Sequence, residues 1–196
     1  MITFEDLRRI CPQASSRRLD RVVKPLNAAM DEFRIVENVG RETAFLAQLA
    51  HESAGFHYLR ELASGKAYEG REDLGNTEPG DGVMFKGWGW MQTTGRKNTR
   101  NVSLRLFGDE RLIEDPELID PPSLELAARA AGDFWTIGAG ENLSRRAIAA
   151  GAQPGVNLND LADRGEFTLI TLCINGGMNG YADRVAYWER AKDVLA

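Results

Sequence analysis

Two glutamates lie close together where the chain changes from an apolar stretch to a glycine-rich one. Glu52 follows Leu49 and Ala50, and Glu61 comes nine residues later. A neutral carboxylic acid and an ionised one can together protonate a leaving oxygen and deprotonate water, which is the chemistry that cleaves a glycosidic bond. Apolar neighbours favour the neutral form of a carboxylic acid, so we expect Glu52 to be the acid of such a pair.

The two glutamates can act on one substrate only if the chain bends between them. On one continuous helix, side chains nine positions apart would point to opposite faces, at about 100° per residue. Gly55 supplies a break. Glu61 could then face Glu52 across a cleft, at a separation that leaves room for a water and gives inversion. Two ordinary surface glutamates would leave the same pattern in the sequence.

The elements that must position this pair are predicted to be mainly helical. Apolar periodicity indicates helices over residues 3–12, 25–36, 41–54, 94–107, 124–137, 143–150, 167–174 and 181–195. Pro25 is expected in a first turn, and Ser123 is expected to cap the helix that follows it. Closely spaced glycines over residues 65–95 predict a long functional loop, with a small β-hairpin near residues 83–92. Residues 151–159 are predicted to form a second loop.

Composition and the remaining motifs argue against several other functions. The net charge of −5 provides no global field for nucleic acid, and no run approaches the roughly 20 apolar residues that span a bilayer. The two histidines, His51 and His57, lack the i, i+4 spacing of a zinc motif, so we expect no metal and no cofactor. Cys11 and Cys173 are far apart in the sequence, which fits reduced thiols although pairing stays open.

Several short motifs occur in one order along the chain. They are Ala50-His51-Glu52-Ser53, Glu61, Tyr68-Glu69-Gly70-Arg71, Leu74-Gly75-Asn76, Gly80-Asp81-Gly82, Lys86-Gly87-x-Gly89-x-x-Gln92-x-Thr94-Gly95-Arg96-x-Asn98, and Ile174-Asn175-Gly176-Gly177-x-Asn179-Gly180 with Asp183-Arg184. Together they resemble glycoside hydrolase family 19, and they are most similar to its bacteriophage endolysins, with the chitinases of the family more distant. The motifs cover residues 45–99 and 170–190.

This resemblance implies a mainly α, lysozyme-like fold, with two helical lobes flanking a substrate cleft. One catalytic domain would span residues 1–196, with residues 104–165 as a candidate for the smaller lobe. The resemblance implies Glu52 as general acid, Glu61 as general base and Thr94 as the residue that orients the attacking water. The implied substrate-binding residues are Gln92, Asn98, Asn175, Tyr68, Arg71 and Arg184, the last of them near the base.

The sequence departs from the family pattern at two positions. Trp88 stands where family members usually carry arginine, and Thr99 stands where most carry tyrosine. An aromatic ring packs well against the apolar face of a sugar, so we expect Trp88 to stack on the substrate. Gln92 and Thr94 could instead only satisfy the backbone of a turn, and Asn175 could only end a helix.

We therefore expect an endolysin that hydrolyses the β-1,4 bonds of peptidoglycan for host cell lysis. It would act as a monomer, without nucleic acid and without stable membrane insertion. Because the sequence shows no secretory leader, we expect it in the host bacterial cytoplasm until lysis, and then in the periplasm and cell wall. A chitinase acting on poly-N-acetylglucosamine, a non-catalytic glycan-binding module and a lytic transglycosylase remain open alternatives.

Overall fold

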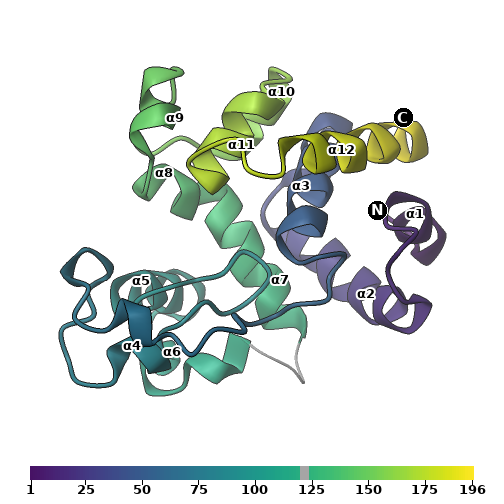
Figure 1. Ribbon diagram of the computed structural model, residues 1–196. Helices are drawn as coiled ribbons and strands as arrows, with labels where there is room; N and C mark the ends of the chain where they lie inside the picture. Colours follow the sequence, from purple (N-terminus) through teal and green to yellow (C-terminus); the bar gives the residue numbers. More distant parts are fainter. Residues whose placement is uncertain (120–123) are drawn as a thin grey trace.

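The computed structural model describes residues 1–119 and 124–196, and it is mainly helical, as predicted (Figure 1). The first part of the chain forms α1 (Phe4–Ile10), α2 (Ser16–Glu32) and α3 (Val39–Glu52). The middle part forms α4 (Asp81–Met84), α5 (Arg96–Phe107) and α6 (Arg111–Glu114). The last part forms α7 (Leu124–Asp133), α8 (Ala139–Glu141), α9 (Arg145–Ala149), α10 (Leu158–Asp163), α11 (Phe167–Asn175) and α12 (Tyr181–Leu195). A π-helical turn, Phe134–Gly138, joins α7 to α8. Within the described residues, none of these helices has both the length and the apolar character needed to cross a membrane.

The buried apolar side chains fall into two groups, which define two lobes. The larger group spans α1 to α3 and α8 to α12, whereas the smaller consists of Trp88, Val102, Leu112, Ile119 and Ala130. Helix α7 contributes to both groups and runs between the two lobes (Figure 1). The predicted smaller lobe at residues 104–165 does not match this arrangement. The buried residues Ala139, Ala147, Leu158 and Leu161 belong to the larger core. The smaller lobe contains the glycine-rich loop with α4, α5 and α6 (Figure 1), and Trp88, Val102 and Leu112 of this lobe lie in the smaller core.

Helix α3 lies at the centre of the larger lobe. Every residue from Thr43 to Ala50 is buried, since α12, α10 and the short turn Ile35–Glu37 pack around the helix. A helix buried on all sides has little freedom to shift or rotate. The end of α3, where Glu52 lies, is therefore a fixed point of the fold.

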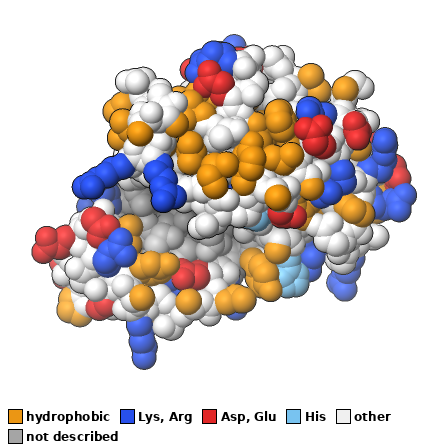
Figure 2. Space-filling view, turned by 45° about the horizontal axis from the view of Figure 1, so that its top comes forward, with side chains coloured by type: hydrophobic (Ala, Val, Ile, Leu, Met, Phe, Trp, Pro, Cys, Tyr) orange, Lys and Arg blue, Asp and Glu red, His pale blue; other side chains and the backbone are white. Residues whose placement is uncertain are grey.

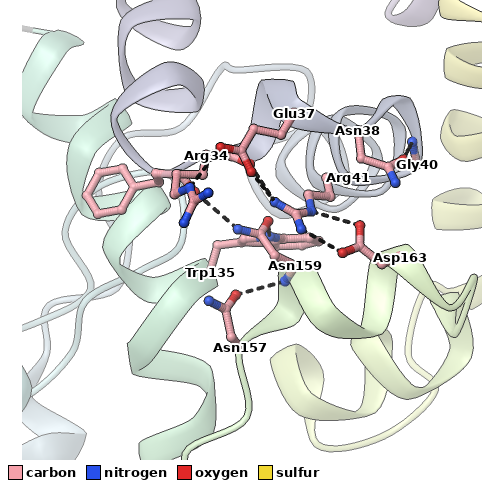
Figure 3. Close-up of polar contacts among 10 residues, drawn as sticks. Arg34, Glu37, Asn38, Gly40, Arg41, Trp135, Asn157, Asn159 and Asp163 are labelled. Atoms are coloured by element: carbon pink, nitrogen blue, oxygen red, sulfur yellow. Dashed lines mark hydrogen bonds and ion pairs between the residues drawn. The ribbon is translucent and has the colours of Figure 1, made fainter.

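A polar network holds the opposite end of α3 to α10 (Figure 3). Arg41 forms an ion pair with Asp163 at 2.6 Å and donates to the Arg34 carbonyl at 2.9 Å. Asn159, at the start of α10, accepts from the Trp135 indole nitrogen at 2.8 Å. These contacts join three elements distant in sequence, and so they add to the apolar packing that fixes α3.

Three local predictions differ from the structure. Pro25 lies inside α2, not in its first turn, because the helix starts nine residues earlier and is capped by Ser15. The predicted hairpin is reduced, within the described residues, to the isolated bridges Arg60–Trp88 and Trp88–Thr93, since α4 takes up part of the segment. The second predicted loop ends early, because α10 begins at residue 158. The predicted cap Ser123 lies outside the described residues.

Candidate active site

Glu52 is the last residue of α3, and the chain turns sharply after it. Ser53 follows the helix, and its hydroxyl accepts a hydrogen bond from the Phe56 amide at 2.7 Å. Ala54, Gly55 and Phe56 all have positive φ angles, of 51°, 68° and 62°, which a right-handed helix cannot contain. The predicted break at Gly55 is confirmed. It releases the chain that carries the second glutamate from the direction of α3.

Glu61 is fixed to the glycine-rich loop through both its backbone and its side chain. Its amide donates to the Gly87 carbonyl at 2.8 Å, and the Gly89 amide donates to the Leu59 carbonyl at 2.6 Å. The carboxylate accepts from the Tyr68 hydroxyl and from the Gly87 amide, each at 3.1 Å. Both oxygens of the side chain thus accept hydrogen bonds from the loop. Glu61 therefore belongs to the smaller lobe, and Glu52 to the larger.

The contact with Glu61 also defines the state of Tyr68. Burial first, and then the hydrogen bond to Glu61 and its negative charge, raises the pKa of Tyr68 above its usual value. The hydroxyl therefore stays protonated and remains a donor over a wide range of pH. Tyr68, predicted as a substrate-binding residue, contacts the candidate base directly.

A buried arginine holds Glu52 from the side of α12. Arg184 Nη2 lies 2.5 Å from Glu52 Oε1, in an ion pair that lacks the angles of a hydrogen bond. Its Nη1 donates to Gln48 Oε1 at 2.5 Å, and its Nε donates to the Asn179 carbonyl at 3.3 Å. The prediction that Arg184 binds substrate near the base was wrong. The side chain is 1% exposed, and its ionic partner is the candidate acid, not Glu61.

Sequence reasoning missed Gln48, which holds this arginine. It is fully buried and donates to Thr171 Oγ1 at 2.8 Å while it accepts from Arg184. Its position four residues before Glu52, on the same face of an apolar helix, was the available signal. His51 was predicted to be a packed or hydrogen-bonding residue beside the acid, and this is confirmed, because its Nδ1 lies 2.6 Å from Asp183 Oδ2.

Three of the predicted site residues line one small cavity between the lobes. Gln92, Thr94 and Asn98 come from the smaller lobe, and Glu141 and Asn142 come from the larger. Figure 2 shows the surface hollowed between the upper and lower parts of the molecule, with Lys and Arg side chains at the edge of the hollow. The structure thus brings these three predicted polar side chains together at one cavity, where they face residues of the larger lobe.

The same side chains also stabilise the loop. Gln92 donates to the Gly89 carbonyl at 2.8 Å, Thr94 to the Gln92 carbonyl at 3.0 Å, and Asn98 to the Thr94 carbonyl at 2.8 Å. The alternative that they satisfy turn backbone therefore holds alongside their place in the cavity. Gln92 also lies against Gly87, since a Cβ added to that glycine would be 2.2 Å from Gln92 Oε1.

Asn175 lies on the larger lobe as the last residue of α11, before Gly176 with a φ of 72°. Its side chain is exposed and makes no hydrogen bond within the described part of the chain. A Cβ added to Gly177 would lie 3.7 Å from Asn175 Oδ1 and 3.2 Å from Arg146 Nη1. Arg146, which sequence reasoning did not single out, therefore lies beside Asn175.

Trp88 does not lie where a sugar could stack on it, so that prediction was wrong. The side chain is 3% exposed, packs in the smaller core, and donates from Nε1 to the Met84 carbonyl at 2.9 Å. Arg71, also predicted to bind substrate, forms an exposed ion pair with Asp73 at 2.6 Å. In the described residues, no cluster of His, Cys, Asp and Glu side chains is arranged to hold a metal ion.

Comparison with solved structures identifies the fold. Chitinase C from Streptomyces griseus superposes with a TM-score of 0.71 and 17% identity, over 99% of this chain and 76% of that one. A bacterial family 19 chitinase superposes with a TM-score of 0.72 and 19% identity, over 100% of this chain and 95% of that one. The protein has the fold of the family 19 chitinases. No family model matches its sequence.

The family 19 fold accounts for the two-lobed, helical architecture that the motifs implied. Superposition over nearly the whole chain means that both lobes, and the junction between them, have counterparts in the chitinases. At 17–19% identity, similarity of fold does not determine function, which depends on the residues of the site.

Proposed function

We propose that this protein is an inverting glycoside hydrolase that cuts β-1,4 bonds between N-acetyl sugars. Glu52 donates its proton to the leaving oxygen, and Glu61 takes a proton from the water that attacks the anomeric carbon from the opposite face. Thr94 orients this water, and Gln92, Asn98 and Asn175 bind sugar hydroxyl and N-acetyl groups. No cofactor takes part in this scheme.

The observation that carries the proposal is the attachment of the two carboxylates to different lobes. Glu52 ends a helix of the larger lobe with its side chain 23% exposed, while two donors of the smaller lobe orient Glu61. An acid and a base on opposite sides of a junction can act on opposite faces of a sugar bound between them. A non-catalytic binding module has no need of an oriented second carboxylate in this place.

For the substrate we propose bacterial peptidoglycan, with the protein acting as an endolysin that reaches the wall once the host's inner membrane is open. The ordered motifs support this choice through their resemblance to phage endolysins. The fold neighbours are chitinases by their titles, which supports a second candidate, hydrolysis of poly-N-acetylglucosamine by the same two glutamates.

Product analysis tests both the reaction and the substrate. Purified peptidoglycan and soluble chitin oligomers are digested separately, and NMR follows the anomeric form of the first product. We expect the α-anomer from peptidoglycan, since inversion of a β-linkage gives α. Release from chitin alone would select the second candidate. An anhydro product, lighter by one water in mass spectrometry, would instead indicate a lytic transglycosylase.

Two substitutions test the roles of the carboxylates. Glu52→Gln and Glu61→Gln should each lower kcat by about 100- to 10,000-fold, the usual contribution of a general acid or base, while the circular dichroism spectrum stays unchanged. Glu72→Gln, at an exposed glutamate of the same loop region, is the matched control and should keep full activity. Unchanged wall clearing by the Glu52 variant would refute the assignment.

A further inference from the structure

A second cavity, of about 330 Å³, lies beside the segment that joins Glu52 to Glu61. Its wall is formed by the first two turns of α2, through Ser15, Arg17, Arg18 and Arg21, and by His57 and Leu59 of the joining segment. The proposed hydrolysis does not use any of these side chains. The cavity brings three guanidinium groups and an imidazole to one place.

The charges in this cavity are not balanced by the part of the chain that the structure describes. Arg17 and Arg21 make no ion pair there, and the Arg18 guanidinium forms its one hydrogen bond among the described residues with the His57 ring nitrogen Nδ1. No carboxylate belongs to a described residue of the cavity wall. By contrast, Arg8 and Arg164, also at the surface, pair with neighbouring glutamates at 2.6 and 2.8 Å.

An anion bound in this cavity would reduce the repulsion between its positive charges. Arg17 and Arg21 are four residues apart on one helix face, where like charges repel. They lie in the first turns of a 17-residue helix, whose N-terminus adds a partial positive charge. A planar guanidinium group matches a carboxylate through two parallel hydrogen bonds. The cavity therefore has the charge and the donors of a site for carboxylate groups.

We propose that this cavity binds the carboxylates of the peptide stems of peptidoglycan, an inference that rests on the proposed function. Leu59 lies two residues before Glu61, within about 7 Å along an extended chain. A stem of four residues reaches about 13 Å from the sugar that carries it. The cavity is thus within reach of a stem on a glycan bound at Glu61. Chitin carries no such carboxylates, so this site would distinguish the two candidate substrates.

The test compares glycan with and without stems. Soluble peptidoglycan strands are assayed intact and after an amidase has removed their peptides, with the double variant Arg17→Gln/Arg21→Gln and the wild type. We expect the variant to raise KM for intact strands about tenfold and to leave KM for stripped strands and chitin oligomers unchanged. The matched control Arg8→Gln/Arg164→Gln removes the same charge from exposed ion pairs elsewhere and should change neither KM.

A direct binding measurement keeps this proposal separate from the proposed function. The isolated stem tetrapeptide is titrated into the wild type, and NMR follows the resonances of α2 and of residues 57–59. We expect shifts in these segments that vanish in the double variant and weaken with salt. An equal effect of the variant on intact and stripped strands, or no peptide-dependent shift, would overturn the stem site even if the enzyme hydrolyses glycan. If the protein binds the tetrapeptide but does not hydrolyse glycan, only the proposed function is refuted.

Discussion

At the scale of single residues, the two candidate catalytic carboxylates have contrasting surroundings. Glu52 meets a buried cation at the end of a buried helix, whereas Glu61 meets a neutral hydroxyl and a backbone amide. The first contact orders a side chain through charge, and the second through hydrogen bonds. Arg184 and Tyr68 therefore hold the candidate acid and the candidate base, respectively.

Replacing Arg184 should lower both the stability of the protein and its rate of hydrolysis. Arg184→Met leaves Gln48 and the Asn179 carbonyl without their donors and leaves Glu52 without its cation. We expect the free energy of unfolding to fall by about 3–5 kcal/mol, the usual cost of breaking a buried pair. Urea denaturation measures this cost. Arg184→Lys keeps the charge but not the fork of donors. Its free energy of unfolding should therefore lie between those of the wild type and Arg184→Met. An unchanged urea midpoint for Arg184→Met would show that the network does not stabilise α3.

The pKa of Tyr68 provides a test of its contact with the base. The negative charge of Glu61 and the hydrogen bond to it contribute to raising this pKa. Removing the charge should therefore lower the pKa of Tyr68 toward its usual value. Ultraviolet titration of phenolate absorbance, with Tyr68→Phe to assign the signal, should show one tyrosine ionising at lower pH in Glu61→Gln. If the titration of that tyrosine did not move, the two side chains would not be in contact in solution.

At the scale of elements, the glycine-rich loop positions the base and the polar wall together. Gly87 donates to the Glu61 carboxylate, accepts from its amide, and lies in contact with Gln92. Only a residue without a side chain fits between these two groups. The loop therefore depends on glycine here for close approach of neighbours, and not for an unusual backbone angle.

Gly87→Ala should consequently damage activity more than stability. The new Cβ would lie 2.2 Å from Gln92 Oε1 and 3.0 Å from Gln92 Cδ, so the flexible end of Gln92 must move away from the candidate base. We expect kcat/KM to fall at least tenfold, with a loss of unfolding free energy of about 1 kcal/mol. Gly70→Ala is the control. Its Cβ meets no atom within 4 Å, although φ is +67°, so it should cost similar stability without loss of activity. Equal activity of the two variants would contradict the role of this contact.

At the scale of the whole molecule, the two lobes depend on α7, which has buried residues on both sides. Ala127 and Ala131 pack in the larger core, and Ala130 packs in the smaller. The small side chains let helices approach closely on either side. The larger core also contains Cys11 and Cys173, both free.

These two thiols report on the packing of the larger lobe. Burial raises the pKa of Cys11 to about 12 and that of Cys173 to about 11. The thiolate is the reactive form, so neither residue should react with Ellman's reagent at pH 8 in the folded protein, and both should react in urea. Cys11→Ser and Cys173→Ser would assign any signal. Rapid reaction of either thiol in the native state would show that the lobe opens around it.

Much of this architecture follows from local patterns. Periodicity predicted most of the longer helices, and α12 has the predicted bounds. Gly55 predicted the end of α3 because a left-handed backbone is inexpensive at glycine. Pro25 misled the prediction, since its ring suits a first turn, whereas burial in the core retains it in the middle of α2.

The sequence by itself therefore determined the helical character, the break between the two glutamates and the order of the polar motifs, because each depends on neighbours within a few residues. Only the tertiary structure decided which carboxylate Arg184 joins, that Trp88 is core, and which helices belong to which lobe. Glu52 and Arg184 are more than a hundred residues apart along the chain and 2.5 Å apart in space. Contacts of that kind arise from the packing of whole helices, whose partners no local pattern specifies.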